Sequence, residues 1–150
     1  MKIIVDTNII VNVLLSPSQK SASFKVFEMC LENKLKPQIG YALFKEYEDV
    51  MSRPEIQLRA KYTPAEIDEI LNGFLSVCNW VKIHYLWRPN LKDEGDNHLV
   101  DLAVASNAQW IVTQNIKDLE SGELRFGFRS ISPEKFLEVI HGNNHISDNR

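Results

Sequence analysis

The stretch that decides the fold is Lys2-Ile3-Ile4-Val5-Asp6-Thr7-Asn8, at the start of the sequence. It contains a short run of β-branched residues without polar alternation, which is typical of a strand buried on both faces. Asp6, Thr7 and Asn8 are residue types that commonly cap helices. The apolar spacing over 9–15 then fits a helix. The stretch therefore predicts a buried strand that passes directly into a helix.

The rest of the sequence continues this alternation of strands and helices. Short strands are predicted at 37–40, 81–85, 110–113 and 129–131, and helices at 22–33, 43–51, 64–78, 97–107 and 133–141. Alternating strands and helices indicate an α/β domain with a mostly parallel central sheet. We expect one domain over 1–141 and a polar, frayed C-terminal tail over 142–150.

The composition is that of a folded protein without a general attraction to nucleic acid. Hydrophobic residues make up 44% and charged residues 25% of 150 residues, which excludes a disordered chain. The formal net charge of −3 means that any nucleic acid must bind through a local basic patch. No apolar segment is long enough to span a bilayer. Cys30 and Cys78 lie in apolar stretches and are expected to be reduced, and no signal peptide is expected, so we expect a cytoplasmic location.

Acidic residues recur where the predicted strands end. Asp6 follows the first strand, Glu46 lies on the helix after the second, Asp96 and Asp101 flank the start of the helix at 97–107, and Asp118 follows the strand at 110–113. The working site of a parallel sheet lies beyond the carboxyl ends of its strands. Carboxylates gathered there would repel one another unless a hard divalent cation such as Mg²⁺ or Mn²⁺ were bound. One or two such ions can activate a water to attack a phosphodiester.

Each acid also has an ordinary structural explanation. Asp6 could cap a helix, Glu46 could belong to a solvated helix face, and Asp118 could be a loop residue. Asp101 is more informative because it interrupts an apolar stretch, where an acid is unfavourable unless it is paired or metal-bound. Asp96 and Asp101 are about 140° apart around a helix, so they converge only if Asp96 lies at or before its start. Which of the two is the inner ligand stays open.

Four blocks of sequence, in order, carry a resemblance to a known family. They are Val5-Asp6-Thr7-Asn8-Ile9, Glu46, the segment 93–105 (DEGDNHLVDLAVA) and the segment 111–119 (IVTQNIKDL). The chain resembles the PIN-domain family of metal-dependent ribonucleases, and in particular the VapC-type toxins of bacterial toxin–antitoxin pairs. The resemblance implies a three-layer α/β/α fold and hydrolysis of RNA phosphodiesters at a Mg²⁺ or Mn²⁺ site. By position, that site would comprise Asp6, Glu46, Asp101 and Asp118, with Asp96 close by.

The resemblance also implies supporting residues and a protein partner. Asn8 matches a polar residue that orients the first aspartate, Thr113 a strand-end hydroxyl beside the site, and Asn115 a polar residue two positions later. Many members have an aspartate at the position of Asn115, whereas the toxins often have asparagine. In the family an antitoxin segment typically covers the active site. The apolar helices at 22–31 and 67–77 could supply an antitoxin groove or a homodimer contact.

RNA would have to meet basic side chains around the mouth of the site. The candidates by nearness to the loops are Lys20, Lys45, Arg53, Arg59, Lys61, Arg88, Lys92 and Lys117. Tyr47, Trp87 and Trp110 could stack on bases, although packing in the core or at its rim is the commoner role of such residues. His98, at the start of a predicted helix, could lie near the acids.

Two other functions compete with a nuclease. A haloacid-dehalogenase-like phosphatase also places an aspartate after its first strand, but it needs a second aspartate two residues later, where this chain has Asn8. A catalytically silent PIN-like module that binds RNA or protein is the second alternative. Retention of the acids argues against it, because an acid cluster without a role is unfavourable.

Overall fold

The computed structural model describes residues 1–16, 18, 20–83, 97–116 and 128–148. Within these residues a five-stranded sheet has the order β3-β2-β1-β4-β5, and every recorded pairing is parallel. The strands are β1 (Lys2–Val5), β2 (Lys36–Ile39), β3 (Asn79–Trp80), β4 (Trp110–Val112) and β5 (Arg129–Ile131). The predicted α/β architecture with a mostly parallel sheet is confirmed.

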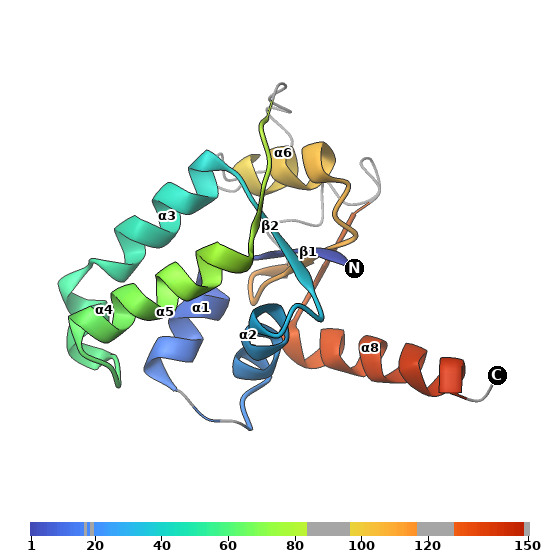
Figure 1. Ribbon diagram of the computed structural model, residues 1–150, viewed down its shortest axis with the longest axis horizontal. Helices are drawn as coiled ribbons and strands as arrows, with labels where there is room; N and C mark the ends of the chain where they lie inside the picture. Colours follow the sequence, from blue (N-terminus) through green and yellow to red (C-terminus); the bar gives the residue numbers. More distant parts are fainter. Residues whose placement is uncertain (17, 19, 84–96, 117–127, 149–150) are drawn as a thin grey trace.

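The described helices cover both faces of the sheet. They are α1 (Thr7–Leu15), α2 (Ala22–Leu31), α3 (Tyr41–Met51), α4 (Pro54–Arg59), α5 (Pro64–Val77), α6 (Asn97–Ser106) and α8 (Pro133–Asp148). Helix α6 contacts β1, β2 and β4 on one face, while α2 and α8 pack together on the other (Figure 1). Helices α3, α4 and α5 lie at the left of the same view. The result is a three-layer α/β/α fold, as the resemblance implied.

Strand β1 lies in the middle of the sheet, between β2 and β4. Its residues Ile3, Ile4 and Val5 are fully buried. A central strand with both faces covered needs apolar side chains at consecutive positions, which explains the run at the start of the sequence. Asp6 follows this strand immediately, so the fully buried residues of strand β1 fix the position of Asp6.

The third strand differs from its prediction. A strand was expected over 81–85, but β3 is Asn79–Trp80, and residues 84 and 85 lie outside the described residues. Asn79 faces Gln38 of β2, and its Nδ2 donates to Gln38 Oε1 at 2.7 Å. The ladder closes with Val81 N donating to Ile39 O at 2.8 Å. Strand β2 ends at Ile39, and the pairing of β3 with β2 ends there as well. Pairing with β2 therefore determines which residues form β3, and local alternation in the sequence does not reveal this.

Two helix boundaries also differ. No helix was predicted between 51 and 64, yet Pro54 begins α4, because proline suits the first position of a helix. The last helix was expected to end near His141, but α8 continues to Asp148. Gly142 does not stop it: the backbone there is helical, a Cβ would meet open space, and glycine costs only about 1 kcal/mol relative to alanine.

The apolar faces of α2 and α5 are used against each other. The rings of Phe27 and Phe74 stack with their centroids 5.3 Å apart, and Tyr47 meets Phe74 edge-on at 5.9 Å. A capping box begins α5, with Thr63 and Glu66 bonded reciprocally. Internal packing therefore accounts for much of the apolar surface that suggested a dimer or antitoxin contact.

Phe74→Ala should lower the free energy of unfolding by about 3–5 kcal/mol, because it leaves a cavity where Phe27 and Tyr47 now pack. Leu58→Ala is the matched control: Leu58 is 86% exposed, so its change should stay within about 0.5 kcal/mol. Urea unfolding followed by circular dichroism measures both. Equal losses in the two variants would contradict this account of the core.

Candidate metal centre

The site is built around Asp6, at the carboxyl end of β1. Its backbone N–H donates to Val112 O at 3.0 Å, which ties it to the neighbouring strand β4. Its side chain also caps α1, with Oδ1 accepting from Thr7 N at 2.7 Å. Asp6 is 6% exposed. The structure therefore confirms that Asp6 caps α1 through Oδ1, and this leaves Oδ2 for other partners.

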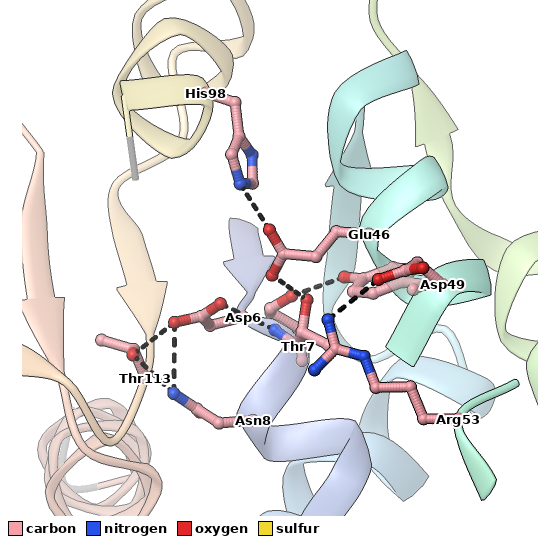
Figure 2. A network of polar contacts seen from close by, with 10 residues as sticks. Asp6, Thr7, Asn8, Glu46, Asp49, Arg53, His98 and Thr113 are labelled. Carbon is pink, nitrogen blue, oxygen red and sulfur yellow. Dashed lines mark hydrogen bonds and ion pairs between the residues drawn. The ribbon is translucent and has the colours of Figure 1, made fainter. Parts of the chain in front are cut away.

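The other oxygen of Asp6 is held from two sides. Thr113, which follows β4 and is fully buried, donates its hydroxyl to Asp6 Oδ2 at 2.7 Å (Figure 2). Asn8 Nδ2 lies 3.2 Å from the same oxygen and 3.3 Å from Thr113 Oγ1. Asn8 Oδ1 in turn accepts from Gln114 N at 3.2 Å. These bonds fix the orientation of the Asp6 carboxylate and join the ends of β1 and β4.

Glu46 reaches the site from α3 and is held at both carboxylate oxygens. Thr7 donates its hydroxyl to Glu46 Oε1 at 2.5 Å. His98, in the first turn of α6, places Nε2 at 2.7 Å from Glu46 Oε2. Figure 2 shows Glu46 between His98 and Thr7, on the side of Asp6 away from Thr113. Three separate parts of the chain therefore converge here, as expected for the carboxyl edge of a parallel sheet.

The surroundings shift the pKa values of the two carboxyl groups in opposite directions. Burial raises the pKa of Asp6 above its usual value, and the charge of Glu46 adds to this, while bonds from Thr113 and Thr7 oppose it. The hydrogen bond from His98 lowers the pKa of Glu46, with a further contribution from Thr7. Asp6 is thus an ionisable group whose charge the fold disfavours, next to a carboxylate that stays charged.

Two of the basic candidates and one aromatic candidate are placed less favourably for binding RNA, while Arg88, Lys92 and Lys117 lie outside the described residues. Arg53 Nη2 lies 2.9 Å from Asp49, and Lys45 lies 3.6 Å from Glu48, so both face acids on α3. Such exposed pairs are weak, because solvent screens them. Tyr47 is buried and donates its hydroxyl to a backbone carbonyl of β1, so base stacking by Tyr47 is excluded.

One further aromatic candidate, Trp110, and one supporting residue, Asn115, can also be placed. Trp110 packs edge-on against Phe136, at 6.5 Å between ring centroids. Trp87 lies outside the described residues. Asn115 reaches the network through its backbone N–H, which donates to Thr113 Oγ1 at 3.0 Å.

The structure brings together Asp6, Glu46, Asn8 and Thr113 of the predicted site. Asp101 is buried on α6, one helical turn after His98, and so on the same side of that helix. Asp96 and Asp118 lie outside the described residues, so their predicted places in the site stay predictions. Over the described parts of the chain, no group of three or more histidine, cysteine, aspartate or glutamate side chains is gathered closely enough to hold a metal.

The two hydrogen bonds that hold Glu46, from Thr7 and from His98, were not predicted from the sequence. Thr7 was interpreted only as a capping type, although its hydroxyl bonds Glu46 from the adjacent helix. His98 was expected only to lie near the acids, and the structure identifies Glu46 as the residue that it contacts. No local signal identifies either contact, because each joins residues at least 39 positions apart.

Comparisons with known proteins identify the family of the chain. The family model described as PIN domain matches residues 2–117. The chain therefore belongs to the PIN-domain family. No curated protein sequence matches it significantly. In the described parts, no helix is long and apolar enough to cross a membrane.

Two solved structures share the fold. A chain in the structure of VapBC-1 from nontypeable Haemophilus influenzae has a TM-score of 0.58 and 12% identity, covering 89% of this chain and 99% of that chain. A chain in the structure of VapBC2 from Rickettsia felis, bound to a DNA fragment from their promoter, has a TM-score of 0.56 and 18% identity, covering 88% and 98%.

Asp6→Asn should make the metal-free protein more stable at neutral pH. The raised pKa means that ionised Asp6 destabilises the fold at pH values above that pKa. This penalty disappears as the pH falls below 3.8, the usual pKa of an aspartate in an unfolded chain, because Asp6 is then neutral in both states. Asparagine keeps the capping oxygen.

Urea unfolding in EDTA, at about pH 7 and at lower pH values down to about 4.5, measures the difference between Asp6→Asn and the wild type. We expect a gain that shrinks with falling pH. A variant less stable than wild type at neutral pH, or a gain that does not vary with pH, would show that the carboxylate is well accommodated.

Proposed function

We propose that this PIN-domain protein is a metal-dependent endoribonuclease that hydrolyses RNA phosphodiesters and acts as the toxin of a toxin–antitoxin pair. The observation that carries the proposal is the juxtaposition of Asp6 and Glu46 at the carboxyl end of the sheet, with Asp6 buried and its charge disfavoured. Membership of the PIN-domain family supplies the chemical context.

A divalent cation fits this pair of residues. Burial and the neighbouring Glu46 both raise the pKa of Asp6, and a cation would reverse both effects by stabilising the ionised carboxylate. The donors available from the pair are carboxylate oxygens, which suit Mg²⁺ and Mn²⁺ better than softer metals. The proposed cofactor is therefore Mg²⁺ or Mn²⁺.

The proposed metal-binding and catalytic set is wider than this pair. It comprises Asp6, Glu46, Asp96, Asp101 and Asp118, with Asn8, Thr113 and Asn115 in support. A bound cation would activate a water and offset charge on the phosphodiester. The contribution of the chain is orientation: Thr113 and Asn8 fix Asp6 Oδ2, and Thr7 fixes Glu46 Oε1. Rigid carboxylates keep their geometry during the reaction, which is how enzymes position reacting groups.

The phosphate backbone of RNA would meet Lys45 on α3 and Arg53 just after that helix. Lys45 lies next to Glu46 in the sequence, and Arg53 lies close enough for its charge to lower the pKa of Glu46. Their ion pairs with Glu48 and Asp49 are more than half exposed on the basic side, so a phosphate can replace them at small cost.

An antitoxin protein is the proposed partner. The support is that the two structures described above are of VapBC assemblies, and a chain in each shares this fold. A homodimer is a further proposal that size-exclusion chromatography with light scattering tests directly, since a clean monomer would contradict it. The alternative is a catalytically silent PIN-like module that binds RNA or protein.

Purified protein should cleave a mixed single-stranded RNA with Mn²⁺ or Mg²⁺ and not with EDTA. Asp6→Asn should lower the rate at least about 100-fold while the circular dichroism spectrum stays unchanged, because removing one charged ligand disables a metal site. Asp68→Asn, the same change on the exposed side of α5, is the control and should cleave as the wild type does. Equal cleavage by Asp6→Asn and wild type would contradict the assignment, and RNA binding without cleavage would favour the silent module.

A further inference from the structure

His98 links two helices that are far apart in the sequence. It lies in the first turn of α6, and its ring reaches Glu46 on α3, with Nε2 2.7 Å from Oε2 (Figure 2). The two side chains are 12% and 35% exposed. An ionised carboxylate only accepts hydrogen bonds, so this contact assigns a proton to Nε2. The ring therefore donates to the carboxylate proposed as a metal ligand.

The bond completes the restraint of Glu46. Thr7 holds Oε1 from α1, and His98 holds Oε2 from α6, so the carboxylate cannot rotate without breaking one of the bonds. Each carboxylate oxygen has two lone pairs, so one bond at each oxygen leaves electron pairs for a cation. The arrangement orients Glu46 without blocking it.

The second ring nitrogen argues against a purely structural role. Nδ1 is buried and has no hydrogen-bond partner within the part of the chain that the structure describes. Burying an unpaired nitrogen is unfavourable, and an apolar side chain would fill the space without this penalty. The histidine is therefore best explained by what Nε2 does.

We propose that His98 is a positioning residue that orients the Glu46 carboxylate for binding a divalent cation. The inference rests on the proposed function, because it assumes that Glu46 is a metal ligand. Hydrogen-bond partners of metal-bound carboxylates typically account for a 10- to 100-fold effect on metal affinity. His98 acts through Glu46, so its loss weakens metal binding and is overcome by excess metal.

Two amide substitutions make the test sharp. The amide nitrogen of glutamine can take the place of Nε2, whereas that of the shorter asparagine corresponds to Nδ1 and stops short of Glu46. His98→Gln should therefore bind Mn²⁺ within about threefold of wild type, and His98→Asn should bind about 10- to 100-fold more weakly. Electron paramagnetic resonance of free Mn²⁺, at one fixed pH, measures the affinity without reference to RNA cleavage.

Activity gives an independent readout. In a Mn²⁺ titration of RNA cleavage, the midpoint for His98→Asn should move to higher metal by the same factor, while the rate at saturating metal returns close to that of wild type. His141→Ala, an exposed histidine on α8, should change neither quantity. Thermal melting by circular dichroism verifies that all variants are folded.

The outcomes separate this inference from the proposed function. Equal Mn²⁺ affinity in wild type and His98→Asn, or equal loss in His98→Gln and His98→Asn, would overturn the positioning role even if the wild type cleaves RNA. Wild type that binds Mn²⁺ but never cleaves RNA would contradict the proposed function, while the affinities of the two amide variants still decide the role of His98. Wild type without affinity for Mn²⁺ would overturn both.

Discussion

The burial of the Asp6 carboxylate at the end of the central strand is the constraint on which the site depends. An acid that is 6% exposed must be compensated, and here Thr113, Asn8 and the N-terminus of α1 supply the bonds. Those bonds also tie β1 to β4 and set the direction in which α1 leaves the sheet. Compensation of one charge thus organises the local fold as well as the site.

The hydrogen bonds from neutral groups only partly offset the cost of burying the charge of Asp6, so the ionised form of this carboxylate stays unfavourable. The pKa of Asp6 remains raised, because burial outweighs the bonds it accepts and Glu46 adds a like charge. Glu46 has the opposite balance, since His98 and Thr7 both favour its charged form. A cation placed between such groups would stabilise the ionised form of Asp6 most, because that form is the less favourable of the two. The orientation of Glu46 is already set by its two hydrogen-bond partners.

Much of this organisation was predictable from local patterns. The apolar run at Ile3, Ile4 and Val5 predicted a buried central strand, and the turn into α1 placed an acid at its end, because strand and helix periodicities are local properties of the sequence. The limits of β3 and α8 were not predictable in this way. Pairing with β2 fixes β3, and the helical signal of α8 continues past a glycine at an exposed position.

The sequence by itself determined the α/β class, the order of the elements, and the identity of Asp6 and Glu46 as candidate ligands. Only the tertiary structure decided that Thr7 and His98 hold Glu46, that Tyr47 belongs to the core, and that Lys45 and Arg53 face the acids Glu48 and Asp49 of α3. The physical reason is range. Helix and strand signals depend on neighbouring residues, whereas the bonds that orient a carboxylate join residues that only the folded sheet brings together.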